Sequence, residues 1–302
     1  MRSITIAGGS GFLGGILEKY FKNKGFIINI LTRNPKRNNE YYWNGTDLGE
    51  WQSVINGTDI LINLAGRSVD CRYNDKNKKE ILDSRVNSTH VLALAINLSE
   101  PPPKIWINSS TATIYNSSLE KQMTERNGDI GDDFSMNVAK SWEAAFNSTT
   151  NPKTRKLILR TAIVLGKKGG PLKPLKQLTK LGLGGKQGSG QQKVSWIHEN
   201  DFARAIEFLI NAENLRGSFN LSTPTPITNI ELMSGLRKAL GIPIGLSQPK
   251  SLIEFGAKLI GTEAELVLKS RNVIPERLLE NGFVFLYDDI EMAFKNLLSL
   301  KK

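Results

Sequence analysis

The sequence has few of the residues that mark secreted or metal-binding proteins. It holds one cysteine, Cys71, and two histidines, His90 and His198, among 302 residues. One cysteine cannot form an internal disulfide, and so few thiols and imidazoles disfavour a metal site. Long apolar runs are missing too, since no segment reaches the roughly 18–20 residues that span a bilayer. We therefore expect a soluble, cytoplasmic protein with no metal and no membrane partner.

Acidic residues are missing from one long stretch of a chain whose net charge is +11. No Asp or Glu occurs between Ala144 and His198. The basic residues of that stretch are Lys153, Arg155, Lys156, Arg160, Lys167, Lys168, Lys173, Lys176, Lys180, Lys186 and Lys193. The stretch is either a solvated surface or an electropositive mouth that attracts a phosphorylated cofactor or an anionic substrate. No DNA-reading module accompanies it, so we expect no nucleic-acid partner.

Short β-branched runs alternate with helical patterns over the first two-thirds of the chain. Strands are predicted at 3–7, 26–31, 59–65, 104–108, 156–165 and 217–221, and helices at 12–23, 74–98, 137–147, 201–211 and 228–240. This alternation is typical of βαβ units. It predicts an α/β fold, a Rossmann-type doubly wound parallel sheet with a smaller, mostly helical C-terminal lobe.

The texture of the sequence changes after Gly166, where glycine-rich segments frame short helical pieces. We expect an NADP-binding Rossmann domain over 1–165 plus about 200–222. The substrate-binding C-terminal lobe would then take 166–199 plus 223–302. The apolar residues beyond Gly241 either pack within this lobe or form the interface of a homodimer.

The strongest local pattern is the glycine-rich turn between the first predicted strand and helix. It reads Gly8-Gly9-Ser10-Gly11-Phe12-Leu13-Gly14, a GxxGxxG spacing. Glycines there allow a tight turn, close approach of the backbone to a pyrophosphate, and close packing of helix on strand. The free N–H groups of the helix N-terminus attract the phosphates. We therefore expect cofactor contacts from Gly8, Ser10, Gly11, Phe12, Leu13 and Gly14.

The end of the second strand indicates which dinucleotide binds. An NAD-binding domain usually carries Asp or Glu there to accept a hydrogen bond from the ribose 2′-hydroxyl. This chain has Thr32-Arg33-Asn34-Pro35-Lys36-Arg37 instead. Arg33 suits bidentate contact with a 2′-phosphate. The alternative is a basic surface turn, but the pattern favours NADP(H) as cofactor.

Further motifs extend these observations over nearly the whole chain. They include Asn63-Leu64-Ala65-Gly66, Asp83-Ser84-Arg85, Asn108-Ser109-Ser110-Thr111, Trp142-Glu143-Ala144-Ala145, Ser195-Trp196-Ile197-His198 and Val273-Ile274-Pro275-Glu276-Arg277. Together they resemble the extended short-chain dehydrogenase/reductase superfamily. More narrowly, the chain is similar to its atypical epimerase family, of the cell-division-inhibitor-like or nucleoside-diphosphate sugar epimerase type.

The resemblance implies two lobes that enclose a cleft, and it implies positions for the cofactor and the chemistry. Leu64, Ala65 and Gly66 would pass beneath the cofactor, and Arg85 with its neighbour Glu80 would reach it from the following helix. Thr111 would hold the reacting oxygen of the substrate. Lys140 would bind the nicotinamide ribose. The implied function is an NADP(H)-dependent oxidoreductase or epimerase acting on a small hydroxy or carbonyl compound, either anionic or nucleotide-linked.

The catalytic tyrosine of such enzymes is missing, because Met136 stands four residues before Lys140. A thioether neither donates nor accepts a proton at neutral pH. Three interpretations stay open. Tyr115 could replace the acid or be a packed or pocket-lining residue, the proton could come from the substrate or from water, or the protein could bind NADP(H) as a regulator without turnover. A neighbouring pair, His198 and Asp201, is either a proton relay or structural.

Overall fold

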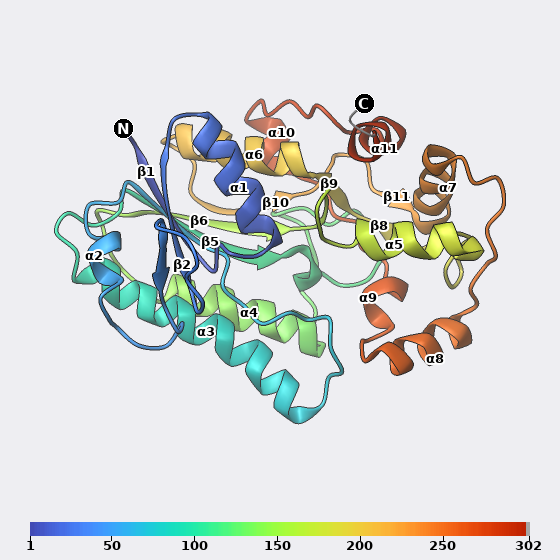
Figure 1. Ribbon diagram of the computed structural model, residues 1–302, viewed down its shortest axis with the longest axis horizontal. Coiled ribbons are helices and arrows are strands. Elements are labelled where there is room, and N and C mark those ends of the chain that lie inside the picture. Colours follow the sequence, from blue (N-terminus) through green and yellow to red (C-terminus); the bar gives the residue numbers. More distant parts are fainter. Residues whose placement is uncertain (300–302) are drawn as a thin grey trace.

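The computed structural model describes residues 1–299. Its centre is a seven-stranded parallel sheet with the order β10-β6-β5-β4-β1-β2-β3 (Figure 1). The strands are β1 (Ser3–Ala7), β2 (Ile27–Thr32), β3 (Glu40–Tyr42), β4 (Ile60–Asn63), β5 (Ile105–Thr111), β6 (Arg155–Thr161) and β10 (Gly217–Leu221). The strand order reverses beside β1, and the carboxyl ends of the strands meet at one edge, where such folds bind ligands. The predicted doubly wound Rossmann-type fold is confirmed.

Helices cover both faces of the sheet, as the apolar character of its strands requires. On one face lie α1 (Phe12–Asn23), α6 (Glu199–Asn211) and α10 (Glu276–Glu280), which share a core with β1, β5 and β6. On the other lie α2 (Gln52–Ile55), α3 (Asp75–Asn97) and α4 (Phe134–Asn147). Figure 1 shows the two helical layers above and below the strands.

The smaller part of the molecule is built from short elements around a separate apolar core. It contains α5 (Leu172–Leu178) with its continuation (Thr179–Leu183), α7 (Asn229–Leu240), α8 (Lys250–Ile260), α9 (Glu265–Leu268) and α11 (Ile290–Leu298). Two small strand pairs join them, β7 (Ile163–Leu165) with β9 (Trp196–His198) and β8 (Lys193–Val194) with β11 (Ile227–Thr228). None of the helices within residues 1–299 is long and apolar enough to cross a membrane.

The strand predicted over 156–165 is two strands in the structure. β6 pairs with β5 and β10 in the large sheet, whereas β7 pairs with β9. The break falls at Ala162, whose amide donates to the Leu221 carbonyl. The chain therefore passes from one sheet to another within a single residue, so apolar periodicity alone could not reveal the change.

His198 and Asp201 support the start of α6 separately. The Nδ1 atom of His198 accepts a hydrogen bond from the Asn200 amide at 3.0 Å, and its ring stacks on Tyr287 with 3.8 Å between centroids. Asp201, fully buried, accepts from the backbone amides of Leu286 and Tyr287. This geometry favours the structural interpretation of the pair over the proton relay.

We predict that His198 makes stability depend on pH. Burial lowers the pKa of His198 to about 4, so the folded protein keeps it neutral where the unfolded chain protonates it below about 6.5. The free energy of unfolding should therefore fall by up to about 3 kcal/mol as the pH drops from 6.5 to 4. Urea titrations at several pH values should show a shallower slope for His198→Asn, which retains a capping acceptor. Equal slopes in both proteins would contradict the prediction.

Candidate dinucleotide and substrate site

The glycine-rich turn forms the N-terminal entrance of α1. Gly8 has φ of +71°, and a Cβ there would lie 2.8 Å from the Ala65 Cα. A Cβ on Gly14 would collide with the Gly9 carbonyl oxygen. Gly11, the N-cap of α1, has ordinary extended backbone and faces open space, with its nearest potential contact 3.9 Å away. Gly8 and Gly14 are therefore required by packing, while Gly11 leaves room for a ligand.

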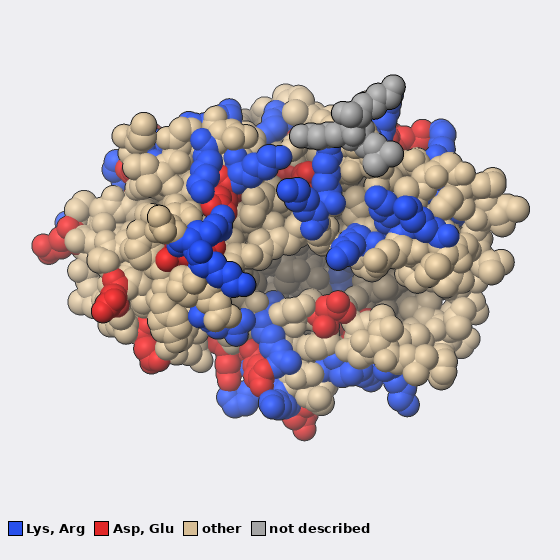
Figure 2. Space-filling model, in the orientation of Figure 1, with Lys and Arg blue, Asp and Glu red and all other residues tan. Residues whose placement is uncertain are grey.

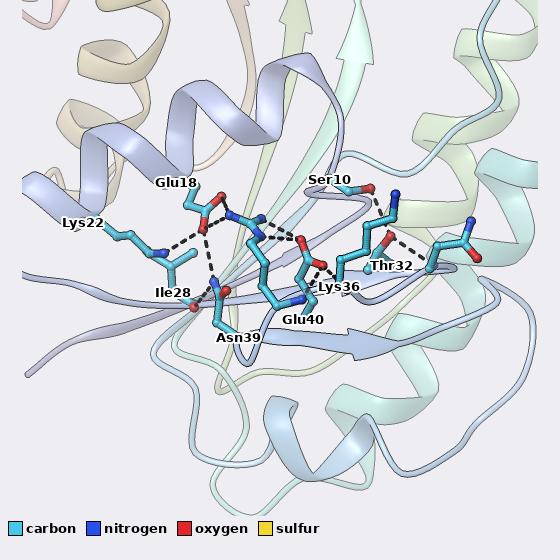
Figure 3. A network of polar contacts seen from close by, with 10 residues as sticks. Ser10, Glu18, Lys22, Ile28, Thr32, Lys36, Asn39 and Glu40 are labelled. Atoms are coloured by element: carbon cyan, nitrogen blue, oxygen red, sulfur yellow. Dashed lines mark hydrogen bonds and ion pairs between the residues drawn. The ribbon is translucent and has the colours of Figure 1, made fainter.

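Beside this turn, the end of β2 presents free positive charge. The hydroxyl of Thr32 donates to Ser10 Oγ at 3.0 Å and so joins the strand end to the turn. Arg37 is held by Glu18 at 2.9 Å and by Glu40 at 2.7 Å (Figure 3). Arg33 is exposed and forms no ion pair within residues 1–299. Of the two arginines in the predicted cluster, only Arg33 is thus available to an anion.

The loop after β4 is held by buried amide side chains. Asn63 Oδ1 accepts from the Ala65 amide at 3.0 Å, and Asn63 Nδ2 donates to Asn108 Oδ1 at 2.8 Å. The two asparagines face each other in the register of β4 and β5. Both asparagines belong to motifs identified in the sequence, but no role was predicted for them. Their positions at matching strand ends were the available signal, since the carboxyl ends of neighbouring parallel strands lie together.

Arg85 is a cation without a carboxylate partner in the described chain. Its guanidinium donates to the carbonyl oxygens of Arg67 and Ile81 and lies 5.1 Å from the Trp142 ring centroid. Burial lowers the pKa of Arg85 to about 10. A Cβ on Gly66 would come within 3.0 Å of this guanidinium, so Arg85 lies directly against the loop after β4.

Glu80 takes a different place from Arg85, although both belong to α3. It forms an ion pair with Arg67, whose guanidinium also donates to Asn77 Oδ1 at 2.8 Å. Arg67 was not singled out from the sequence. In this conformation Glu80 binds a neighbouring side chain of the same loop and helix.

The predicted catalytic residues come from β5 and α4. Thr111 ends β5, and its hydroxyl accepts from the Thr113 amide at 3.1 Å. Lys140, on α4, forms an ion pair with the exposed carboxylate of Asp132. Asp133 caps α4 by accepting from the Met136 amide at 2.9 Å, so the helix starts three residues before the predicted position. Met136 is buried.

A cavity of about 550 Å³ opens beside Met136, in the size range of small-molecule sites. Its wall includes Asp132, the ion-pair partner of Lys140. The other lining residues are Asn116, Ser117, Ser118, Lys121, Met123, Asp129, Asp133 and Lys269. The position of the absent tyrosine therefore borders a polar, accessible space.

Tyr115 does not face this cavity. It is 1% exposed, and its hydroxyl donates to Asn220 Oδ1 at 3.0 Å while accepting from Arg160 at 2.8 Å. Arg160 in turn pairs with Glu143. Burial raises the pKa of Tyr115. The geometry favours the packed-residue interpretation over that of a catalytic acid.

We predict that Tyr115→Phe lowers the free energy of unfolding by about 1–3 kcal/mol, because the buried Asn220 and the half-buried Arg160 each lose a hydrogen bond. Urea denaturation measures this loss, and Tyr42→Phe, at a 63% exposed tyrosine, is the matched control. Turnover, where a substrate is found, should survive in the variant. If Tyr115→Phe loses turnover while its stability is unchanged, the prediction is wrong and Tyr115 acts as the catalytic acid.

The C-terminal segment closes one side of the site through polar contacts. Glu263, between α8 and α9, binds the Arg72 guanidinium at 3.1 Å and the Tyr73 amide at 2.8 Å. Glu265 accepts from Ser135 at 3.0 Å. Figure 2 shows the molecule hollowed between the sheet and this segment, with Lys and Arg side chains along the upper margin, over and beside α5. The hollow meets the carboxyl edge of the sheet.

A parallel sheet, a glycine turn opening α1 and a cleft at the switch point define a Rossmann-type dinucleotide-binding protein. The family model described as the NAD dependent epimerase/dehydratase family matches residues 4–222, and a domain of unknown function, DUF1731, matches 249–297. The chain belongs to the NAD dependent epimerase/dehydratase family and resembles the extended short-chain dehydrogenase/reductases in its fold.

Relatives with curated names align over almost the full length. The mouse epimerase family protein SDR39U1 is 31% identical over 98% of this chain and 99% of its own. The Bacillus subtilis epimerase family protein YfhF is 31% identical over 99% of each chain. Among solved structures, human SDR39U1 with NADPH has a TM-score of 0.89 and 29% identity, covering 98% of this chain and 99% of that one.

Proposed function

We propose that this protein binds NADPH across the carboxyl edge of its sheet. The observation that carries the proposal is the open N-cap Gly11 beside Arg33, which forms no ion pair in the part of the chain that the structure describes. The helix N-terminus would receive the pyrophosphate, while Arg33 would bind the 2′-phosphate that distinguishes NADP from NAD. The NADPH in the human SDR39U1 structure, over a chain of nearly equal length, supports the same cofactor.

The residues around the turn would complete the cofactor site. Ser10, Phe12 and Leu13 belong to the turn itself, and Leu64 to Gly66 form the loop beneath it. Arg85 supplies a positive charge that no described carboxylate neutralises. Glu80 would act indirectly, since its ion pair with Arg67 restrains that loop.

We further infer that the protein is an oxidoreductase or epimerase acting on a small hydroxy or carbonyl compound. The nicotinamide supplies or accepts the hydride when the cofactor is bound. Thr111 would donate a hydrogen bond to the substrate oxygen, and Lys140 would bind the nicotinamide ribose and add positive charge. Because Met136 cannot transfer a proton, water in the polar cavity that Met136 lines would do so.

This assignment gives each of the two parts of the molecule its own ligand. The Rossmann domain, 1–165 plus about 200–222, would bind the cofactor. The remainder, 166–199 plus 223–302, would bind the substrate and cover the cleft. The apolar residues beyond Gly241 would either pack within this part or form the interface of a homodimer.

The test is turnover by NADPH-loaded protein against a panel of small aldehydes, ketones and hydroxy acids, followed by NADPH absorbance. Thr111→Val and Lys140→Ala should each lower kcat/KM by about a hundredfold or more, as expected for groups that act in the transition state. Lys19→Ala, an exposed lysine on α1, is the control. Unchanged kcat/KM in both site variants would contradict the assignment.

A second candidate is an NADPH-binding regulator without turnover. It is favoured by the buried Met136 at the tyrosine position together with the closed hydrogen bonds of Tyr115. The two candidates differ in one measurement. A regulator binds NADPH but does not oxidise it faster than the uncatalysed reaction. Neither Thr111→Val nor Lys140→Ala then changes the measured rate of NADPH oxidation.

A further inference from the structure

A second cavity, of about 640 Å³, lies apart from the one beside Met136, and the two share no lining residue. One of its walls comes from the loop before α3 and from the beginnings of α3 and α4. The other comes from the α8–α9 segment, residues 250–268, which Figure 1 shows beside the start of α3. Its volume is in the range of small-molecule sites. We call this space the second cavity.

Polar contacts hold the two walls of the second cavity together. Glu263 accepts from the Arg72 guanidinium and from the Tyr73 amide, and the Arg72 carbonyl oxygen accepts from the Asn77 side chain at 2.7 Å. A further contact joins the α8–α9 segment to the first turn of α4, where Ser135 donates to Glu265. The cavity is therefore bounded by residues whose positions are fixed on both sides.

The carboxylates that line the second cavity each have a cation of their own. Glu263 pairs with Arg72 at 3.1 Å, Glu265 with Lys269 at 2.6 Å, and Glu254 with Lys250 at 3.6 Å. Their negative charge is thus largely neutralised within the protein, and none of the three is left over for a ligand.

Two ammonium groups that line the cavity have no such partner. Lys78, on α3, and Lys258, on α8, form no ion pair and donate no side-chain hydrogen bond within residues 1–299. They belong to opposite walls, so a ligand between the walls would meet both. Because the uncompensated charge of the second cavity is positive, it attracts an anion.

The same cavity has aromatic residues in its wall. The rings of Tyr73 and Phe134 pack edge to face, with 4.9 Å between centroids, and Lys78 Nζ lies 5.5 Å from the Phe134 centroid. Further rings pack favourably against such a pair in edge-to-face or offset contact. A ligand with a planar ring therefore suits this wall better than an aliphatic one.

Tyr73 also has an unused hydrogen-bonding group. Its hydroxyl is buried and forms no hydrogen bond of normal geometry within the described residues. Burial raises the pKa of Tyr73, and the nearby Ser135 hydroxyl offsets only part of this increase, so the phenol stays a neutral donor. Buried hydroxyls normally have a partner, and one without a partner in the wall of a cavity favours a ligand that accepts a hydrogen bond.

We propose that the second cavity binds an aromatic carboxylic acid, with its carboxylate at Lys78 and Lys258 and its ring against Tyr73 and Phe134. A carboxylate provides the negative charge and the hydrogen-bond acceptors that these groups lack. This inference does not depend on the proposed function, because the second cavity shares no residue with the cofactor turn or with Thr111 and Lys140.

The ligand would join two parts of the molecule that few apolar contacts hold together. Within α8 only Ala257 is buried, and α9 has no buried residue. Segments with so little buried apolar surface open locally at low cost. Binding between Lys78 and Lys258 should therefore slow hydrogen exchange of the backbone amides in residues 250–268.

The test is calorimetric titration of NADPH-saturated protein with 2-naphthoate, and with 2-naphthamide as its uncharged counterpart. We expect 2-naphthoate to bind at least about tenfold more tightly than the amide. Lys78→Gln/Lys258→Gln should weaken 2-naphthoate binding about tenfold or more and leave amide binding nearly unchanged. The matched control is Lys19→Gln/Lys153→Gln, which removes the same charge from exposed lysines elsewhere. Tyr73→Leu, which removes ring and hydroxyl together, should weaken both probes.

Four results would overturn the inference. They are no binding of 2-naphthoate, equal binding of acid and amide to the wild-type protein, an equal loss of 2-naphthoate affinity in the control variant, and displacement of 2-naphthoate by NADPH. The last result would place the acid in the cofactor site. Failure of the proposed function is distinguishable, because protein that does not bind NADPH can still be titrated with 2-naphthoate alone.

Discussion

Gly11→Asp should weaken NADPH binding by about a hundredfold or more without destabilising the protein. The new carboxylate would lie at the entrance of α1, against the pyrophosphate, where like charges cost several kcal/mol. The backbone tolerates the change, because Gly11 has φ of −84° and ψ of −175°. Asp is also a better N-cap than glycine, so the melting temperature should stay unchanged or rise slightly.

Two variants separate charge from bulk in this experiment. Gly11→Ala adds a Cβ into open space, with its nearest contact 3.9 Å away, and should lose far less affinity. Gly256→Asp introduces the same carboxylate on α8, where a Cβ meets nothing within 4 Å. Fluorescence titration with NADPH gives the dissociation constants. Wild-type affinity in the stable Gly11→Asp protein would exclude the turn as the pyrophosphate site.

Arg33→Asp should reverse the choice of cofactor. Losing a charge-assisted contact to the 2′-phosphate, and adding repulsion, should weaken NADPH binding by about tenfold to a hundredfold. NADH binding should be retained or improved, because a carboxylate there can accept from the ribose 2′-hydroxyl. The quantity to measure is the ratio of the two dissociation constants in parallel titrations.

The matched control for Arg33→Asp is Arg216→Asp, an exposed arginine that precedes β10 at the opposite edge of the sheet. It changes the net charge equally but should leave the ratio of dissociation constants unaltered. If both variants change the ratio by the same factor, the effect is one of overall charge, and Arg33 does not bind the 2′-phosphate.

The fold could be predicted where local pattern and tertiary environment agree. β1, α1 and β10 occupy the predicted residues, since each combines apolar periodicity with a clear turn signal at its ends. β3, of three residues and largely exposed at the sheet edge, carries no such pattern and was missed. The break between β6 and β7 was missed because it depends on a partner strand that lies far along the chain.

The tight glycine turn could be predicted for a similar reason. Turn geometry is local, so the close packing at Gly8 and Gly14 follows from the glycine spacing. Partner choice is not local: the ion pairs of Arg37 and Glu80, and the bonds of Tyr115 to Asn220 and Arg160, join side chains that spacing cannot relate. Sequence reasoning therefore left the role of Tyr115 open, and burial was needed to favour one interpretation.

The late position of β10 in the sequence affects how the protein folds during synthesis. β6 carries three buried apolar residues, Leu157, Ile158 and Leu159, and its outer neighbour β10 lies more than fifty positions later. During synthesis on the ribosome, six strands are complete while β6 is still an unpaired edge. Such an edge invites pairing with another nascent chain. A fragment ending at residue 165 would leave the outer edge of β6 unpaired. A fragment ending at residue 222 would include β10, which pairs with that edge.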